Sequence, residues 1–371
     1  MEKGSKRELS FDIAKALAII LVVIYHCDNF PKGVHSIGTL FYMPLFMFVS
    51  GYFFHYHDDI KSIKELWLFI WKKIKKIYFF YLKYEIIFLI LRNVFLNIGF
   101  YSTTIEYGGK YVNYIANLKA FGIELIKIVF GFGREIFAGT FWFLIALMII
   151  ILGYAIMNYF TKWITKINKN IVLSILAIVS FIIGCLMRYY YNIPRFSPAC
   201  TLLFFFHLGN MLNFKKEKIQ FNNVYLAIFC LIILIFMNIK GYVAMNNNLF
   251  TDPFFLLICS LSGIYLTMYI SKFIENKTKY CKAILCYIGK NTLVIMAIQF
   301  IAFKLVMLIQ LHVGAINYDD LAILTGANNA NWWYLLYVLF GIGIPLLYGY
   351  IIDKIKNIFK KQTILKNVQK C

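Results

Sequence analysis

The stretch that decides the fold is Val224–Ile239, VYLAIFCLIILIFMNI, a run of 16 residues without a charged side chain. Similar blocks recur along the chain, and Ala16–Tyr25 (ALAIILVVIY) is one of them. About 20 apolar residues in a helix match the hydrocarbon core of a bilayer, which is about 30 Å thick. Such blocks predict helices that cross a membrane.

The composition of the whole chain agrees with this interpretation. The 371 residues are 61% hydrophobic and 15% charged, with a mean hydropathy of +0.71. Soluble proteins are about 45–50% apolar and about 25% charged. The net charge of +21 lies in short clusters between the apolar blocks, whereas a nucleic-acid-binding domain concentrates its basic charge in one patch. We therefore expect an all-α integral membrane protein surrounded by lipid, with no nucleic-acid partner.

The distribution of basic residues predicts the topology. We expect a single transmembrane domain over residues 1–371 with both termini in the cytoplasm. With the N-terminus inside, 25 Lys and Arg lie in cytoplasmic segments, 8 lie outside and the remaining 5 lie within spans, as the positive-inside rule requires. The ten predicted spans are 10–27, 37–56, 77–100, 137–160, 171–191, 199–213, 224–240, 253–273, 286–311 and 332–352.

Segments between the spans have their own patterns. Ile60–Ile77, IKSIKELWLFIWKKIKKI, predicts an amphipathic helix on the inner leaflet, either as a membrane anchor or as a binding site for an anionic ligand. The stretch 118–132 is apolar enough for the membrane interface, although its charges argue against a full span. The segments 101–136 and 311–331 are the longest predicted outside the cell.

The cysteines predict no metal site and no disulfide framework. None of the eight forms a CxxC pair or a Cys/His spacing suited to a metal. Most of them lie in or beside apolar blocks, where a thiol behaves as a small hydrophobic group.

Ionisable residues inside a membrane span are costly and are functional candidates by default. The first span carries Asp12, Lys15 and His26. His26 lies eleven positions after Lys15, which places both on one helix face about 16 Å apart along the axis. Asp12 lies three residues before Lys15 and can pair with it. Taken alone, Lys15 is explained by an ammonium group that extends to the lipid headgroups, and His26 by a position at the membrane interface. Because both residues lie on one helix face, we favour a functional polar path along that face.

Several motifs resemble those of the acyltransferase-3 family of bacterial membrane acyltransferases. The Lys-x₁₀-His spacing resembles the family signature, and Phe41–Phe54 (FYMPLFMFVSGYFF) resembles its second-helix segment. Other landmarks follow in the family's order, and they are the basic run Lys72–Lys76, Phe141–Leu144 (FWFL), Phe206–Asn210 (FHLGN) and Tyr287–Leu293 (YIGKNTL).

The resemblance implies an enzyme that transfers an acyl group, usually acetyl from acetyl-CoA, to a hydroxyl of a cell-surface glycan or its lipid-linked precursor. It implies that His26 is the catalytic base and that Lys15 helps to hold the CoA phosphates. The lysines Lys72, Lys73, Lys75 and Lys76 are expected on the same cytoplasmic side. A neutral imidazole suits proton removal from a sugar hydroxyl near neutral pH, and no metal is implied. The expected location is the bacterial cytoplasmic membrane.

Other candidates for substrate binding are Asp12, Arg134, Glu135 and Gln299. Arg134 and Glu135 either orient the sugar or the base, or form an exposed interfacial pair. Gln299 stands where the family usually has a histidine, and an amide hydrogen-bonds but transfers no proton at neutral pH.

Two alternative functions remain open at this stage. One is a transporter or export component for polysaccharide, which inverted repeats and matching broken helices would favour. The other is a non-catalytic relative of the acyltransferases, for which Gln299 is the best support.

Overall fold

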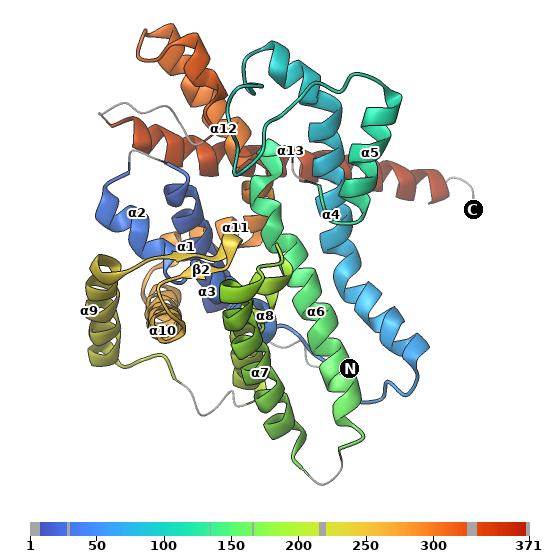
Figure 1. The fold of residues 1–371 in the computed structure, drawn as a ribbon, viewed down its shortest axis with the longest axis vertical. Coiled ribbons are helices and arrows are strands. Elements are labelled where there is room, and N and C mark those ends of the chain that lie inside the picture. The colour runs from blue at the N-terminus through green and yellow to red at the C-terminus, as the bar shows by residue number, and fades with distance from the viewer. Residues whose placement is uncertain are drawn as a thin grey trace.

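The structure is a computed structural model that describes residues 8–27, 30–133, 135–164, 167–214, 220–324 and 332–368. Helices make up most of the described chain (Figure 1). Their bounds are α1 Leu9–Tyr25, α2 Lys32–Thr39, α3 Tyr42–Tyr52, α4 Ile63–Asn97, α5 Leu118–Val129, η1 Ile136–Phe141, α6 Trp142–Thr161, α7 Lys169–Tyr190, α8 Phe196–Phe214, α9 Val224–Lys240, η2 Met245–Asn247, α10 Pro253–Lys277, α11 Lys279–Lys290, α12 Thr292–His312, η3 Tyr318–Ala322 and α13 Trp333–Val368.

Five helical segments in the described residues are long and apolar enough to cross a membrane. They are Ile136–Thr161, Lys169–Tyr190, Pro253–Lys277, Thr292–His312 and Trp333–Lys356, and Val224–Lys240 is a shorter apolar helix. Apolar side chains such as Ile182 and Ile183 on α7 and Phe229 and Ile232 on α9 are exposed, which suits lipid rather than water. The fold is therefore that of an all-α membrane protein, while the number of spans and the sides of the termini stay predictions.

The predicted amphipathic segment and the predicted third span form one helix, α4, which is 35 residues long. The Ser62 side chain caps its start by accepting a hydrogen bond from the Glu65 N–H. No glycine or proline lies between Ile63 and Asn97, so nothing in the sequence interrupts the helix between its polar and apolar parts.

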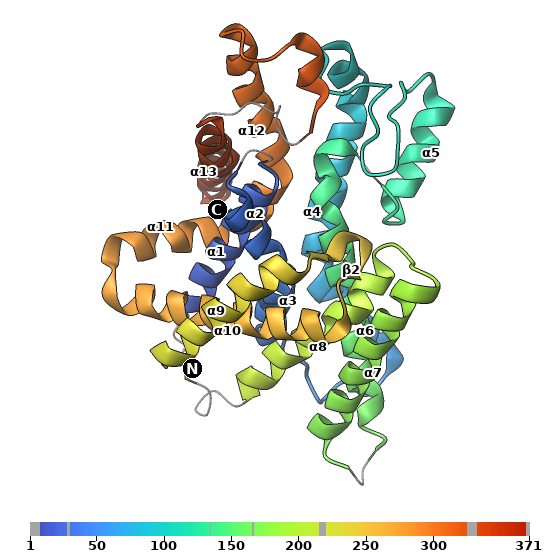
Figure 2. The ribbon, with the colours of Figure 1, turned by 60° about the vertical axis from the view of Figure 1, so that its left-hand side comes forward.

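Two predicted spans are broken. Residues 37–56 divide into α2 and α3, and Pro44 is the third residue of α3, where its missing N–H leaves no helical hydrogen bond unmade. Residues 286–311 divide at Asn291, which ends α11 and precedes α12. Figure 2 shows α11 lying across the bundle and α12 rising from it.

Glycines from the sequence motifs lie where helix backbones touch. A Cβ at Gly51 of α3 would overlap the carbonyl oxygen of Phe206 in α8, and a Cβ at Gly209 of α8 would overlap that of Phe48 in α3. Gly289 of α11 meets the Asp12 carbonyl of α1 in the same way. Close backbone packing of this kind is typical of membrane helices with small residues at their interface.

A short antiparallel hairpin joins α9 to α10. Its strands are β1 Val243–Ala244 and β2 Leu249–Phe250. Asn248 adopts the left-handed conformation with φ 53°, and its buried amide accepts a hydrogen bond from Thr201 at 2.9 Å and donates one to the Gly184 carbonyl at 2.9 Å. The hairpin is thereby fixed to α7 and α8.

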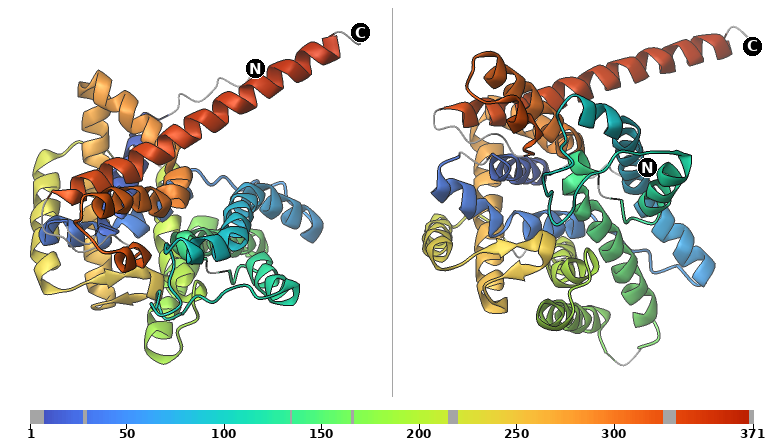
Figure 3. Two further views of the ribbon diagram at one scale, coloured as in Figure 1. Left: turned by 90° about the horizontal axis from the view of Figure 1, so that it is seen from above. Right: turned by 45° about the horizontal axis from the view of Figure 1, so that its top comes forward.

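The segments that follow α4 and α12, residues 101–117 and 313–324, meet each other and are here called the outer segments (Figures 1 and 2). The Tyr107 hydroxyl donates to the Ala322 carbonyl at 2.8 Å. The Lys304 ammonium of α12 is buried and donates to the carbonyls of Leu321 and Ile323 at 2.6 Å each. Figure 3 shows, in contrast, that the C-terminal part of α13 extends beyond the other helices.

Candidate active site

Helix α1 fixes the position of His26. Its central residues, including Ala16, Ala18 and Ile19, are fully buried, and the helix packs against α10, α11 and α3. His26 directly follows the last helical residue, and its backbone N–H still bonds to the carbonyls of Val22 and Val23. The imidazole is therefore held by a rigid helix end rather than by a loose loop.

His26 lines a cavity of about 640 Å³, here called the histidine cavity. This volume lies within the range of about 300–1,000 Å³ that is typical of small-molecule sites. Its wall combines aromatic and polar side chains from distant parts of the chain, because η1, α6, the hairpin and both outer segments contribute. These side chains include Tyr81, Glu85, Tyr107, Glu135, Trp142, Arg195, Asn246, Asn247 and Phe300.

The His26 ring packs against the rings of Tyr25 and Phe300 and makes no hydrogen bond within the described residues. Phe300 of α12 meets it edge to face, with ring centroids 4.9 Å apart. The nearby His35 ring is instead engaged, since its Nε2 lies 2.8 Å from the Tyr25 carbonyl oxygen. His26 therefore has a fixed ring position and nitrogen atoms that remain available to a ligand.

Ionisable residues form one side of the histidine cavity. The Glu85 carboxylate accepts a hydrogen bond from the Glu135 backbone N–H at 3.1 Å. Arg92 donates to the carboxylates of Glu135 and Glu124. Burial raises the pKa of Glu135, and the hydrogen bond from Arg92 opposes that rise. Arg195 holds the adjoining turn by donating to the carbonyls of Gly131 and Gly133.

A second, smaller cavity of about 100 Å³ lies beside the first, and His26 lines both. Gly139, Trp142 and Asn246 are also common to the two cavities. The small cavity is closed by residues of α1, α3 and the hairpin, among them Tyr42 and Met245. The imidazole thus stands where two spaces of different size adjoin.

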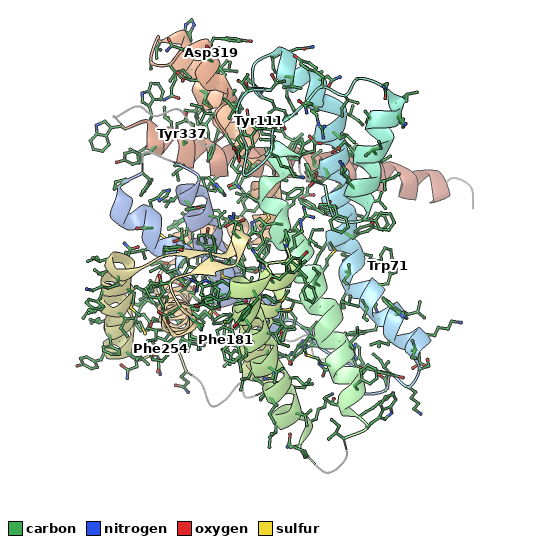
Figure 4. All side chains as sticks on the ribbon, in the orientation of Figure 1. Trp71, Tyr111, Phe181, Phe254, Asp319 and Tyr337 are labelled. Carbon is green, nitrogen blue, oxygen red and sulfur yellow. The ribbon has the colours of Figure 1, made fainter. Side chains whose placement is uncertain are left out.

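The residues expected to bind CoA are divided between two parts of the bundle. Lys15 pairs with Asp12, with 2.8 Å between Nζ and Oδ1, and neither is among the residues that line the histidine cavity. Of the α4 lysines, only Lys73 is partly buried, over the rings of Phe54 and Phe69. Figure 4 shows Trp71, directly before these lysines, at the outer edge of the molecule. The structure joins Asp12 to Lys15 but does not join this pair to Lys72, Lys73, Lys75 and Lys76.

The remaining predicted residues have different surroundings. Glu135 lines the histidine cavity and is buried, so it is not an exposed interfacial residue. Arg134 lies outside the described residues. Gln299 is fully buried, and no described group hydrogen-bonds its amide atoms. In the described part of the chain, no group of three or more His, Cys, Asp or Glu side chains could hold a metal ion.

Several residues of the cavity wall were not predicted from the sequence. Glu85 is an ionisable residue within a predicted span, so the rule that selected Asp12 could have found it. Asn246 and Asn247 belong to a polar run between two apolar blocks, which is a weak signal for a site. Arg195 could not have been selected, because its partners Gly131 and Gly133 are distant in the sequence.

The fold and the cavity define a helical membrane protein with a histidine available to a bound molecule. The family model described as an acyltransferase domain, acyltransferase-3, matches residues 8–350. The chain therefore belongs to the acyltransferase-3 family, which supports a membrane acyltransferase activity. The chain matches no curated protein and no solved structure.

Proposed function

We propose that this protein transfers an acyl group, most simply acetyl, from acyl-CoA to a hydroxyl of a cell-surface glycan or its lipid-linked precursor in the bacterial cytoplasmic membrane. The observation that carries the proposal is the position of His26, whose ring lines the histidine cavity and hydrogen-bonds to no described residue. Family membership supports the reaction class.

In the proposed reaction, His26 acts as general base. A ring nitrogen removes the proton of the sugar hydroxyl while the oxygen attacks the thioester carbonyl carbon. The new C–O bond forms, the C–S bond breaks, and the proton passes from the imidazolium to the departing CoA thiolate. The products are the O-acyl glycan and free CoA, and no other reactant is needed.

The two substrates would approach from opposite ends of α1. Lys15 is the seventh of the 17 residues of this helix and so lies in its N-terminal half, whereas His26 follows its C-terminal end. Lysine ammonium groups are common phosphate ligands, so Lys15 is proposed to contact the CoA phosphates. The exposed lysines Lys72, Lys75 and Lys76 would raise the local concentration of the polyanionic donor through long-range attraction.

Ionisable residues on one side of the histidine cavity would bind the acceptor. Glu135 is proposed to orient the sugar, since its carboxylate is buried beside the cavity and fixed by Arg92. The roles of Asp12, Arg134 and Gln299 in substrate binding stay predictions, and Asp12 would act through its ion pair with Lys15.

The first experiment compares purified wild type, His26→Ala and the control His312→Ala. His312 is an exposed residue at the end of α12 that does not line the histidine cavity. Each protein receives radiolabelled acetyl-CoA and a mixed cell-surface glycan extract, and label on the glycan is counted. Transfer by wild type and His312→Ala, with loss in a folded His26→Ala, would support the proposal. Absence of transfer by wild type, while a known family member works in the same extract, would argue for transport or a non-catalytic role.

A further inference from the structure

A second large cavity adjoins the histidine cavity on the side of the outer segments. It measures about 620 Å³ and lies between residues 109–115, α5 and the end of α4. Tyr107, Glu135 and Ile136 line both cavities, so the two spaces share a wall. We call this second space the tyrosine cavity, after Tyr107, Tyr111 and Tyr114.

Two tyrosines of this cavity have accessible side chains. Tyr111 is 59% exposed and Tyr114 is 50% exposed, and Figure 4 shows Tyr111 on the outer segment between α12 and α4. A tyrosine combines an apolar ring face with a polar hydroxyl. A pyranose ring is complementary to a tyrosine side chain, because the C–H groups of the sugar form an apolar face. The sugar hydroxyls then hydrogen-bond to polar groups around the tyrosine ring.

Polar groups suited to sugar hydroxyls surround these rings. Glu124 accepts hydrogen bonds from Lys127 at 2.6 Å and from Arg92 at 3.3 Å. Hydrogen bonds and charge from these two cations outweigh burial and lower the pKa of Glu124, so its carboxylate is an anionic acceptor at neutral pH. Asn113 adds an amide to the same wall.

The wall that separates the two cavities is rigid. Arg92 bridges Glu124 in the tyrosine cavity to Glu135, which faces both cavities. Tyr107 is fixed through its hydroxyl, which donates to the Ala322 carbonyl and accepts from the Ser102 N–H. The relative positions of the two spaces are therefore set by the protein before any ligand binds.

We propose that the tyrosine cavity binds sugar units of the acceptor next to the unit that is acylated. This inference rests on the proposed function and extends it to the class of acceptor. Each cavity alone is large enough for a small-molecule ligand. The two cavities together therefore provide more space than one sugar unit fills. The preferred acceptor is accordingly an oligosaccharide or polymer, in contrast to a free monosaccharide.

The test measures transfer of labelled acetyl to acceptors of different length. The acceptors are monosaccharide, tetrasaccharide and longer fractions, separated by size after partial acid hydrolysis of the surface-glycan extract. We expect kcat/KM, expressed per sugar unit, to be about ten-fold higher for the longer fractions, equivalent to about 1.4 kcal/mol. The double variant Tyr111→Ala/Tyr114→Ala should lose this preference and retain its activity on the shortest acceptor.

Two control variants separate ring stacking from a general defect. Tyr111→Phe/Tyr114→Phe keeps both ring faces and should keep the preference for long acceptors. Tyr191→Ala removes a tyrosine that is 75% exposed and lines neither cavity, and it should behave as wild type. Equal efficiency on all lengths in wild type, or an equal loss on all lengths in the double alanine variant, would overturn the inference.

A binding measurement keeps this inference separate from the reaction. Fluorescently tagged glycan fractions are titrated onto folded His26→Ala, with and without Tyr111→Ala/Tyr114→Ala, in the absence of acyl-CoA. Tighter binding of longer fractions that depends on the tyrosines would support the tyrosine cavity even if no transfer occurs. Binding that does not depend on length would overturn it, whatever the outcome of the transfer assay.

Discussion

The rings of His26, at the end of α1, and Phe300 of α12 pack edge to face, with a centroid distance of 4.9 Å and an interplanar angle of 71°. Phe300 is only 1% exposed, so its own position is fixed by the core. This contact restricts the orientation of the imidazole without occupying either nitrogen. A general base needs that combination, because misplacement by about 1 Å can reduce a rate about 100-fold.

We therefore expect Phe300→Leu to lower kcat by about ten-fold, which corresponds to about 1.4 kcal/mol of barrier, with little change in KM for acyl-CoA. Steady-state kinetics in detergent would measure both quantities. Phe205→Leu is the matched control, because Phe205 is equally buried but packs on Phe204, with ring centroids 5.5 Å apart. If both variants lower kcat equally, the contact with His26 has no special role.

The ion pair between the partly buried Arg92 and the buried Glu135 predicts a large effect on stability. Arg92→Met would leave the Glu135 carboxylate buried without its cation, which costs about 3–5 kcal/mol. The double variant Arg92→Met/Glu135→Leu should recover part of this loss, because it removes both charges. Thermal unfolding in detergent would rank the variants, and a double variant less stable than Arg92→Met would contradict the explanation.

The same pair predicts a pH dependence. Without Arg92, burial holds the pKa of Glu135 further above its unfolded value. A raised carboxyl pKa destabilises the folded state above the unfolded pKa, and protonation relieves the penalty as the pH falls through the folded value. The stability difference between wild type and Arg92→Met should therefore narrow from about pH 8 towards about pH 5. A constant difference across this range would exclude Glu135 as its source.

The hydrogen bonds of Lys304 hold the outer segment 313–324 next to the histidine cavity. Ile323 and Leu324 line this cavity, and the Lys304 ammonium bonds the carbonyls of Leu321 and Ile323. Lys304→Met would leave both carbonyls without this donor, at about 1–3 kcal/mol each. We expect faster amide hydrogen exchange in residues 313–324 and a higher KM for the glycan. Lys290→Met, at an exposed position on α11, should change neither.

Replacement of the Gln299 amide by an apolar group should change stability and activity in opposite directions. A fully buried amide without a described hydrogen-bond partner costs about 1–3 kcal/mol. Gln299→Met has a similar shape and should raise the melting temperature. If this amide serves a substrate, the same variant should lose activity, whereas an unchanged transfer rate would assign Gln299 to the core alone.

The sequence predicted some helices closely because their apolar blocks have clear ends. The predicted span 224–240 coincides with α9, and 171–191 differs from α7 by one or two residues. The break at Asn291 was not predicted, although residues 289–292 (GKNT) interrupt the apolar pattern with residues typical of a helix end. The close approach of Gly289 to α1 depends on tertiary packing. The hairpin at Val243–Phe250 was missed because two-residue strands have no readable period.

Some residues of the candidate site could be predicted from the sequence, and others could not. His26 and Glu135 line the histidine cavity, and both were selected as polar residues in or beside a span. Lys15 was selected by its spacing from His26, but helical spacing alone does not reveal which space a side chain borders. The tyrosine cavity depends on contacts between residues 109–115 and α5, and these follow from the path of the chain rather than from any motif.

The contacts of Gly51, Gly209 and Gly289 with neighbouring backbones have a consequence for how this chain tolerates mutation. At these positions even a methyl group would push two helices apart, whereas many large side chains facing lipid can be exchanged for other apolar ones. A saturation-mutagenesis map would therefore not follow side-chain size. Apart from His26, its most intolerant positions would be residues that have no side chain at all.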